Sequence, residues 1–251
     1  MVNSTNYYGA FNYPLIPDSF SDSKEFKLKV FDADLAPNYV TRTVRAGIFR
    51  VNPDNPEQTQ LNYEQYVNEG QEFAEQLKHM RRFGIPIAPT YLTVGTNSTG
   101  EMTLYSSTEL LEGENLRIFK HKTIAEDKLF AAEYNNLVGS LCHYFESCFK
   151  ENTKVAYDIF CPRQYIVSEE DRKIYLFDTD SALIEPDDNL ATYLTAKMQE
   201  TVILLQQKFT NMTDAPSSLR PAQESVSDMA KKFEALYAHK RHFLAKFKLT
   251  Q

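Results

Sequence analysis

The sequence predicts an α+β fold in which a small strand-rich part precedes a larger helical part. Alternating apolar and polar residues occur in the first third of the chain, and long amphipathic stretches occur in the second half, where they flank one short hairpin-like segment. A period of two is typical of strands, and an apolar residue every three or four positions is typical of helices. We place the division between the two parts at residue 112, giving 1–112 and 113–251.

Composition excludes several classes of protein. Of the 251 residues, 42% are hydrophobic and 24% are charged, as in ordinary globular proteins. The net charge of −7 argues against a general nucleic-acid-binding protein, and no apolar run approaches the roughly 20 residues of a membrane span. The three cysteines lack metal-type spacing, and the first segment is unlike a secretory signal. We therefore expect a cytoplasmic protein.

In the first part, the pattern predicts two strands, one helix and then two more strands. Residues 24–35 and 39–53 alternate, and a helix over 62–83 follows a turn cluster. Gly84 is placed to end that helix, whose apolar stripe consists of Tyr66, Phe73, Leu77 and Met80. Two strand-like runs around the polar segment 95–101 then predict a hairpin.

In the second part, the pattern predicts three helices and one hairpin. Thr123 and Glu126 form a possible capping box before the first helix, and the hairpin strands are "QYIV" and "KIYLF". The apolar stripes of the three helices are Phe130, Tyr134, Leu137, Leu141, Phe145 and Cys148; Leu190, Leu194, Met198, Val202, Leu205 and Phe209; and Val226, Met229, Phe233, Leu236, Phe243 and Phe247.

Two aspartates follow the second hairpin strand in the stretch "KIYLFDTD". Asp178 and Asp180 are separated by one threonine, so their like charges lie within a few ångströms of each other. Such a pair is costly unless a cation or hydrogen-bond donors neutralise it. The stretch therefore indicates either a cation site or a solvated turn at the end of a strand.

The segment "VAYDIFCPRQYIV" followed by "IYLFDTD" resembles the catalytic core of the kinase-like superfamily, which includes protein kinases and the aminoglycoside and choline phosphotransferases. The resemblance implies a bilobal kinase-like fold. It matches Asp158 to the residue that accepts the proton of the substrate hydroxyl. It matches Gln164 and Asp178 to the ligands of Mg²⁺ or Mn²⁺, with Asp180 as a second acid, as in small-molecule kinases.

The resemblance extends upstream in order and spacing, and there it implies an ATP site. Arg50 stands where the family has its phosphate-binding lysine, and Glu72 would be the acidic partner of that residue, with Glu69 as the next choice. The segment "TELLEGENL" resembles the hinge that binds adenine through backbone groups, which implies nucleotide contacts at Glu109 and Leu111. Gly113 would open the second lobe.

Three hypotheses about function follow. The first is a phosphotransferase that uses Mg²⁺ and moves a phosphoryl group from ATP or another nucleotide to a hydroxyl of a small molecule or protein. The second is an inactive pseudokinase that acts as a nucleotide- or protein-binding module, because segment 31–39 has no glycine and Ala156 replaces the family histidine. The third is an unrelated interaction domain.

Structural roles remain open for the individual site residues. Asp158 is as consistent with a loop cap as with catalysis, and Arg50 with a surface strand position. Glu72 shares its predicted helix with Glu64, Glu69 and Glu75, which together are typical of a solvated acidic face.

Overall fold

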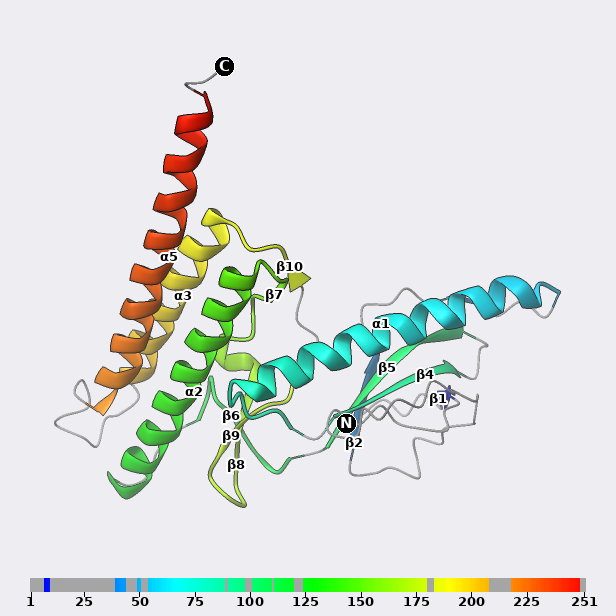
Figure 1. Cartoon of the computed structure of the whole chain (residues 1–251). Helices are drawn as coiled ribbons and strands as arrows, with labels where there is room; N and C mark the ends of the chain where they lie inside the picture. Colours follow the sequence, from blue (N-terminus) through cyan, green and yellow to red (C-terminus); the bar gives the residue numbers. More distant parts are fainter. Residues whose placement is uncertain are drawn as a thin grey trace. The chain divides into compact units, whose positions relative to one another are not determined.

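The structure is a computed structural model that describes residues 7–9, 39–43, 49–50, 54–88, 90–97, 101–109, 111–119, 124–179, 183–207 and 218–248. The chain divides into two compact units (Figure 1). The first unit consists of Met1–Arg82 and Ile87–Leu111, and the second of Phe83–Pro86 and Glu112–Gln251. Both units combine helices with small antiparallel sheets, so the predicted α+β class is confirmed.

The first unit is built on a five-stranded antiparallel sheet. Its strands are β1 (Tyr7–Gly9), β2 (Tyr39–Thr43), β3 (Phe49–Arg50), β4 (Thr90–Asn97) and β5 (Glu101–Glu109). They lie in the order β1-β4-β5-β2, and β3 also pairs with β5. The predicted hairpin is β4–β5, with Val94 opposite Leu104. β1 is not among the predicted strands, and the strand expected at 24–35 lies outside the described residues.

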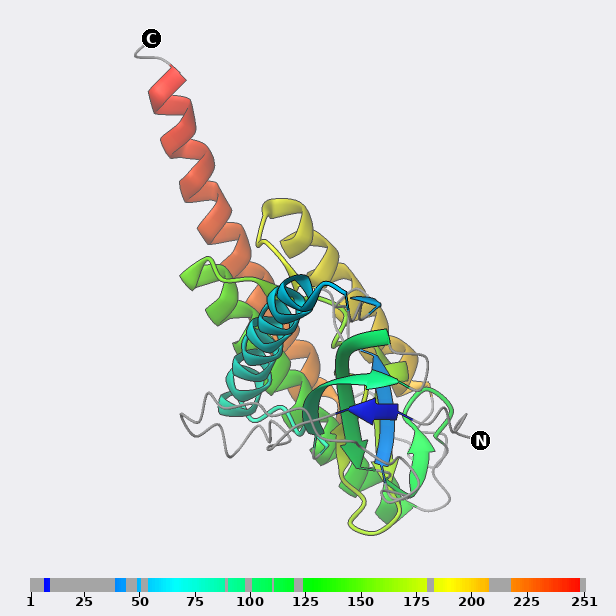
Figure 2. The ribbon, with the colours of Figure 1, turned by 90° about the vertical axis from the view of Figure 1, so that its right-hand side faces the viewer.

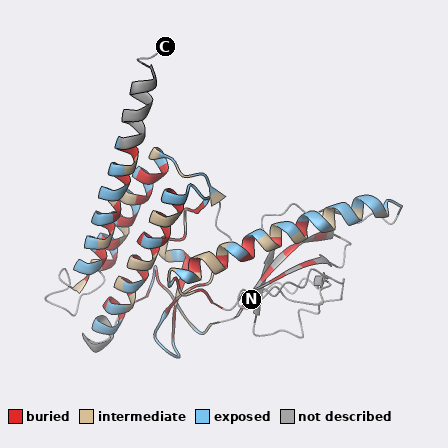
Figure 3. Ribbon diagram, viewed as in Figure 1, coloured by how far each residue is buried: buried red, intermediate tan, exposed pale blue. Residues whose placement is uncertain are grey.

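Helix α1 (Pro56–Arg82) packs on β4 and β5. The helix begins six residues before the predicted start, because Asn55 and Pro56 initiate it. Asn55 Oδ1 accepts a 3.1 Å hydrogen bond from the Gln58 N–H and so caps the first turn. Proline suits the first helical position, which Pro56 occupies. Gly84 follows its last turn with φ at +81°, as predicted for a stop. All four residues of the predicted stripe are buried. Figure 3 shows buried, intermediate and exposed residues alternating along α1.

Three long helices form the core of the second unit: α2 (Ile124–Glu151), α3 (Asp188–Gln206) and α5 (Arg220–Lys248). α5 packs against both α2 and α3, which Figure 2 shows from the side. Asn135 of α2 fixes the start of α5, because its Nδ2 donates to the Ser218 carbonyl at 2.8 Å and its Oδ1 accepts from the Ala222 N–H at 3.1 Å.

The predicted helical stripes are confirmed for the described side chains. Every stripe member in α2 and α3 is buried, as are Val226, Met229 and Phe233 of α5. Leu236 is half-buried, whereas Phe209 and the side chains of Phe243, Phe247 and Glu126 lie outside the described residues, as does Thr123. Within the part of the chain that the structure describes, no helix has an apolar stretch long enough to cross a membrane.

Two small sheets complete the second unit. β6 (Gly113–Asn115), β8 (Tyr165–Ser168) and β9 (Ile174–Leu176) form one sheet in that order, and β7 (Val155–Ala156) pairs with β10 (Leu183–Ile184) in the other. The predicted hairpin is β8–β9, whereas β6, β7 and β10 were not predicted. They are two or three residues long, and their partners lie far away in the sequence.

The segment Phe83–Pro86, just after α1, belongs to the second unit. The Pro86 carbonyl accepts a 2.7 Å hydrogen bond from the Leu176 N–H at the end of β9. The Phe83 ring lies edge-on to that of Tyr144, with centroids 6.1 Å apart. These contacts join the segment to the end of β9 and to α2, and the chain after β9 leads directly into the candidate site.

Candidate functional site

The loop between β7 and β8 carries the predicted catalytic aspartate. The Asp158 carbonyl accepts from the Cys161 N–H at 3.0 Å, and the Cys161 carbonyl accepts from the Gln164 N–H, also at 3.0 Å. The loop ends in a 3₁₀ turn, Pro162–Gln164, which starts with proline because the ring fixes the required φ. The local sequence therefore folds into two consecutive tight turns that place Asp158 and Gln164 on the same short loop.

Three side chains outside the loop hold it in place. Tyr144 Oη accepts a 3.1 Å hydrogen bond from the Ala156 N–H, and the Tyr165 hydroxyl donates to the Ile159 carbonyl. Asn115 Nδ2 donates to the Arg163 carbonyl at 2.7 Å. These contacts come from α2, β8 and β6, so the conformation of the loop depends on the packing of the whole unit.

Gln164 brings two of the predicted residues together. Its side-chain Nε2 donates to Asp158 Oδ2 at 2.9 Å, and its carbonyl accepts from the N–H groups of Phe177 and Asp178 at 3.1 and 3.4 Å. The Gln164 side chain is buried, with 4% exposed, whereas Asp158 and Asp178 are half-buried. One residue thus links the loop aspartate to the aspartate that follows β9.

The Gln164 side chain also has an oxygen without a partner. Because Nε2 faces a carboxylate, the amide orientation is fixed: the reverse orientation would place two oxygens in contact. Among the residues that the structure describes, Oε1 then has no hydrogen-bond partner, although it is buried. An amide carbonyl oxygen and a carboxylate such as that of Asp178 are ligands that Mg²⁺ accepts, so the donor types fit the predicted cation.

The second predicted acid, Asp180, cannot be placed relative to these residues. Asp180 lies outside the described residues, and Thr179 before it is buried, with 2% exposed. Among the described residues, no group of three or more His, Cys, Asp or Glu side chains is placed to hold a metal ion.

Cys161 lies inside the loop, where its environment disfavours the thiolate. Burial, and then the charge of Asp158, raise the pKa of the Cys161 thiol above its ordinary value, while Arg163 and Lys197 act in the opposite direction. A thiol with a raised pKa is protonated at neutral pH and is a weak nucleophile. The environment of the loop therefore does not favour Cys161 as a nucleophile.

The four predicted nucleotide-binding residues belong to the first unit. Arg50 ends β3 opposite Glu101, and Glu109 ends β5 opposite Tyr39; both side chains lie outside the described residues. Leu111 is half-buried and Glu72 is exposed on α1. Asp158, Gln164 and Asp178 thus lie together in the second unit. The four predicted nucleotide-binding residues belong to the first unit and are not part of this group.

Sequence reasoning missed three groups of the site and one on α1. The residues that hold the loop, Asn115, Tyr144 and Tyr165, carry no motif, since their hydrogen bonds join segments far apart in the chain. Within the described part of α1, the Gln76 amide is also buried without a hydrogen-bond partner, and no sequence pattern predicts this.

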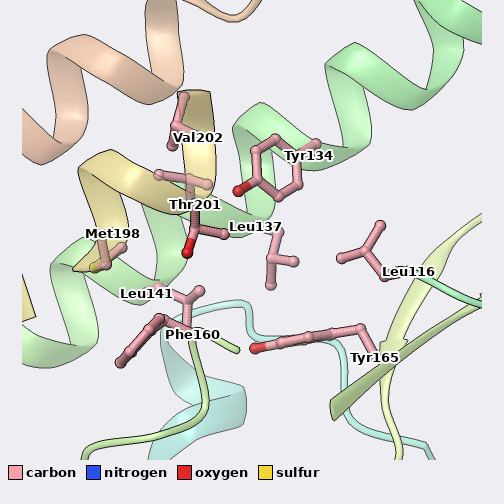
Figure 4. A pocket seen from close by; sticks show the side chains of 10 residues that line it. Leu116, Tyr134, Leu137, Leu141, Phe160, Tyr165, Met198, Thr201 and Val202 are labelled. Carbon is pink, nitrogen blue, oxygen red and sulfur yellow. The ribbon is translucent and has the colours of Figure 1, made fainter. Parts of the chain in front are cut away.

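A small cavity lies between α2, α3 and the loop region. It is lined by side chains of α2, α3 and the loop region, including Tyr134, Thr201, Phe160 and Tyr165 (Figure 4). Its volume of about 10 Å³ is enough for one water molecule. Ligand pockets measure roughly 300–1,000 Å³, so this cavity is not a substrate site.

Comparisons with models of protein families, with curated proteins and with solved structures found no match to this chain.

Proposed function

We propose that this chain is a kinase-like phosphotransferase that moves the terminal phosphoryl group of ATP to a hydroxyl group of a small molecule or protein. The observation that carries the proposal is the position of Gln164, which bonds Asp158 through its side chain and Asp178 through its backbone. The reaction requires a proton acceptor and a cation ligand at one place, and this link supplies one candidate for each.

In the proposed reaction, the Asp158 carboxylate accepts the proton of the acceptor hydroxyl. The hydroxyl oxygen forms a bond to the terminal phosphorus, the bond from that phosphorus to the bridging oxygen breaks, and ADP leaves with the electron pair. The Gln164 amide holds Asp158 in position, so proton transfer does not require the carboxylate to reorient.

Asp178, Asp180 and Gln164 Oε1 would hold the magnesium ion. When bound, that ion would neutralise the charge of the phosphates and offset the repulsion between the two aspartates. Oε1 is buried without a hydrogen bond, so a cation at this position would also remove the cost of an unsatisfied acceptor.

A thermal-shift titration tests the proposal. The wild-type protein, Asp178→Asn and a matched control, Asp228→Asn on the exposed face of α5, are titrated with ATP, ADP and GTP in the presence and absence of Mg²⁺ or Mn²⁺. Ligand at 100 times its dissociation constant adds about 2.7 kcal/mol to the free energy of unfolding, which raises Tm.

We expect a metal-dependent rise in Tm in the wild type and in Asp228→Asn, and none in Asp178→Asn. ADP formation with a panel of hydroxyl acceptors then tests transfer itself. A wild-type Tm that does not respond to millimolar nucleotide with either metal contradicts the proposal.

A pseudokinase is the second candidate, and one observation favours it. Ala156 stands where the family has histidine; it is fully buried, and its N–H is bound by Tyr144. The site therefore has no imidazole at this position to support Asp158. A metal-dependent rise in Tm without ADP formation from any acceptor would identify the chain as a nucleotide-binding module.

A further inference from the structure

A groove lies between α3 and α5, which pack side by side in the second unit (Figure 1). Its volume of about 590 Å³ falls in the range of roughly 300–1,000 Å³ that is typical of binding sites. Along α3 the groove extends from Asp188 to Gln199, and along α5 from Ala230 to Ala238. Most of the lining residues between these limits are alanine or threonine, and their small side chains leave room above the two helix backbones.

The groove is acidic. Among the described residues, the ionisable residues that line it are Asp188 and Glu234. Lys197 and Lys231 are close to lining residues in the sequence but do not line the groove, and each bonds an acidic residue of its own helix, at 2.7 and 3.0 Å. The groove therefore suits an occupant that carries positive charge.

α5 continues after the helices that it packs against have ended. The ring of Tyr237 lies 6.3 Å from that of Phe149, which is in the last turn of α2. Ala238 lines the groove together with Asp188, the first residue of α3. α5 nevertheless continues as a helix through residues 239–248. This last segment therefore lies past the ends of both α2 and α3.

Segment 239–248 has the charge and the length that the groove requires. Its sequence, "HKRHFLAKFK", contains four lysine or arginine residues and no acidic residue, and Phe243 and Phe247 continue the apolar stripe of α5 along the sequence. At about 1.5 Å per residue, the segment spans about 15 Å, and the groove from Asp188 to Gln199 spans about 16 Å. The segment cannot reach the groove of its own chain, because it continues the helix that forms one wall of that groove.

We propose that segment 239–248 of one copy of the chain binds in the groove between α3 and α5 of a second copy, and that the second copy does the same in return. A two-fold axis makes the two contacts equivalent, so the association closes as a dimer. The lysine and arginine residues of the segment meet Asp188 and Glu234, and its apolar stripe packs on the small side chains of the groove. This inference does not depend on the proposed function.

Analytical ultracentrifugation of the full chain over a range of concentrations tests the inference. Ala196→Trp fills the groove, and Glu234→Arg reverses its charge; both positions are exposed, so these variants should fold as the wild type does. The matched controls are Ala235→Trp and Glu224→Arg, at exposed positions of α5 outside the lining. We expect a wild-type dimer whose dissociation constant rises about tenfold or more in the groove variants and stays unchanged in the controls.

A charge exchange then identifies the occupant of the groove. Arg241→Glu should weaken the dimer as Glu234→Arg does, and the double variant, which exchanges the two charges, should restore it. A wild type that stays monomeric at every concentration overturns the inference, and so does a dimer that the groove variants do not weaken. A double variant that associates no better than the single variants shows that another segment or another partner occupies the groove, which also overturns it. Circular dichroism checks the fold of each variant, and Glu234→Arg serves alone if Ala196→Trp does not fold.

Discussion

The side-chain amide of Gln164 donates a 2.9 Å hydrogen bond to the carboxylate of Asp158, six residues earlier in the chain. Gln164 is buried, and its carbonyl simultaneously accepts from the backbone after β9. One residue therefore links the loop to the hairpin, through its side chain on the loop side and through its backbone carbonyl on the hairpin side. Substitutions of the Gln164 side chain should affect stability in a way that depends on the charge they introduce.

Gln164→Glu should destabilise the protein strongly at neutral pH. It places a second carboxylate against Asp158 at a site that is only 4% exposed, and an uncompensated buried charge costs about 3–5 kcal/mol. The repulsion raises the folded-state pKa of the introduced carboxyl above its unfolded value of about 4.3, so the cost is present at neutral pH and shrinks as pH falls through the folded pKa.

Urea unfolding at pH 8, 7, 6 and 5 measures this effect. Gln164→Met, which has similar volume and no charge, is the control, and its difference from the wild type should not vary over this range. Equal pH dependence for the two variants would show that the carboxylate of Asp158 does not face residue 164.

Tyr165→Phe should cost about 2 kcal/mol in the free energy of unfolding. The hydroxyl of this fully buried side chain donates to the Ile159 carbonyl, and its removal leaves a buried acceptor unsatisfied. Tyr175→Phe in the neighbouring strand is the matched control. It removes a 2.7 Å bond to the exposed Asp171 carboxylate, which water can replace, so the loss should stay below about 1 kcal/mol. Chemical denaturation measures the free energy of unfolding of both variants. A larger loss of this free energy in Tyr175→Phe than in Tyr165→Phe would contradict the prediction.

Gly113→Ala should destabilise the second unit by about 3 kcal/mol. A Cβ at this position would lie 2.1 Å from the Val167 carbonyl oxygen, so β6 and β8 would have to separate. Gly139→Ala in α2 is the opposite case, because the nearest atom to its Cβ would be Ser225 Oγ at 4.0 Å. Alanine is favoured over glycine inside a helix, and that variant should gain about 0.5–1 kcal/mol. Melting temperatures that move in the same direction would disprove the close approach of β6 to β8.

The Asp171 carboxyl at the hairpin turn should titrate below its ordinary pKa. The slight desolvation of this exposed carboxyl alone would raise its pKa, but hydrogen bonds from Tyr175, the Lys173 N–H and Ser168 outweigh this effect and lower the pKa. A lowered pKa contributes stability that is present above the unfolded value of about 3.9 and is lost as pH falls through the folded value. NMR titration of the Asp171 carboxyl checks the direction, and in Tyr175→Phe its pKa should rise. An unchanged value in that variant would exclude the tyrosine as a cause.

Most of the helical core was predictable from the sequence. The stripes of α2 and α3 recur with helical spacing because they fill the interior of the second unit, and residues such as Leu194 and Phe145 are fully buried as predicted. The early start of α1 was missed because Asn55 and Pro56 were assigned to a turn. The same residue types initiate both turns and helices, so local composition alone does not distinguish the two.

The candidate site was less predictable than the core. The sequence places Asp158, Gln164 and Asp178 in order along the chain, but the Gln164–Asp158 hydrogen bond depends on a 3₁₀ turn and on anchors from three other elements. The inward amide of Gln76 and the exposed carboxylate of Glu72 depend on the rotation of α1 against its sheet. Such relationships arise from tertiary packing, which no local pattern contains.

The pairing of β7 with β10 encloses the β8–β9 hairpin, and this nesting has a consequence for how the chain folds. Ala156 and Leu183 are distant in sequence, and bringing them together from an unfolded chain requires closure of a long loop. Once the short hairpin that pairs Tyr165 with Leu176 has formed, the ends of that loop are already close, and the entropy lost in joining β7 to β10 is smaller. We therefore expect the loop that carries Asp158 to take its final shape after the hairpin that supports it.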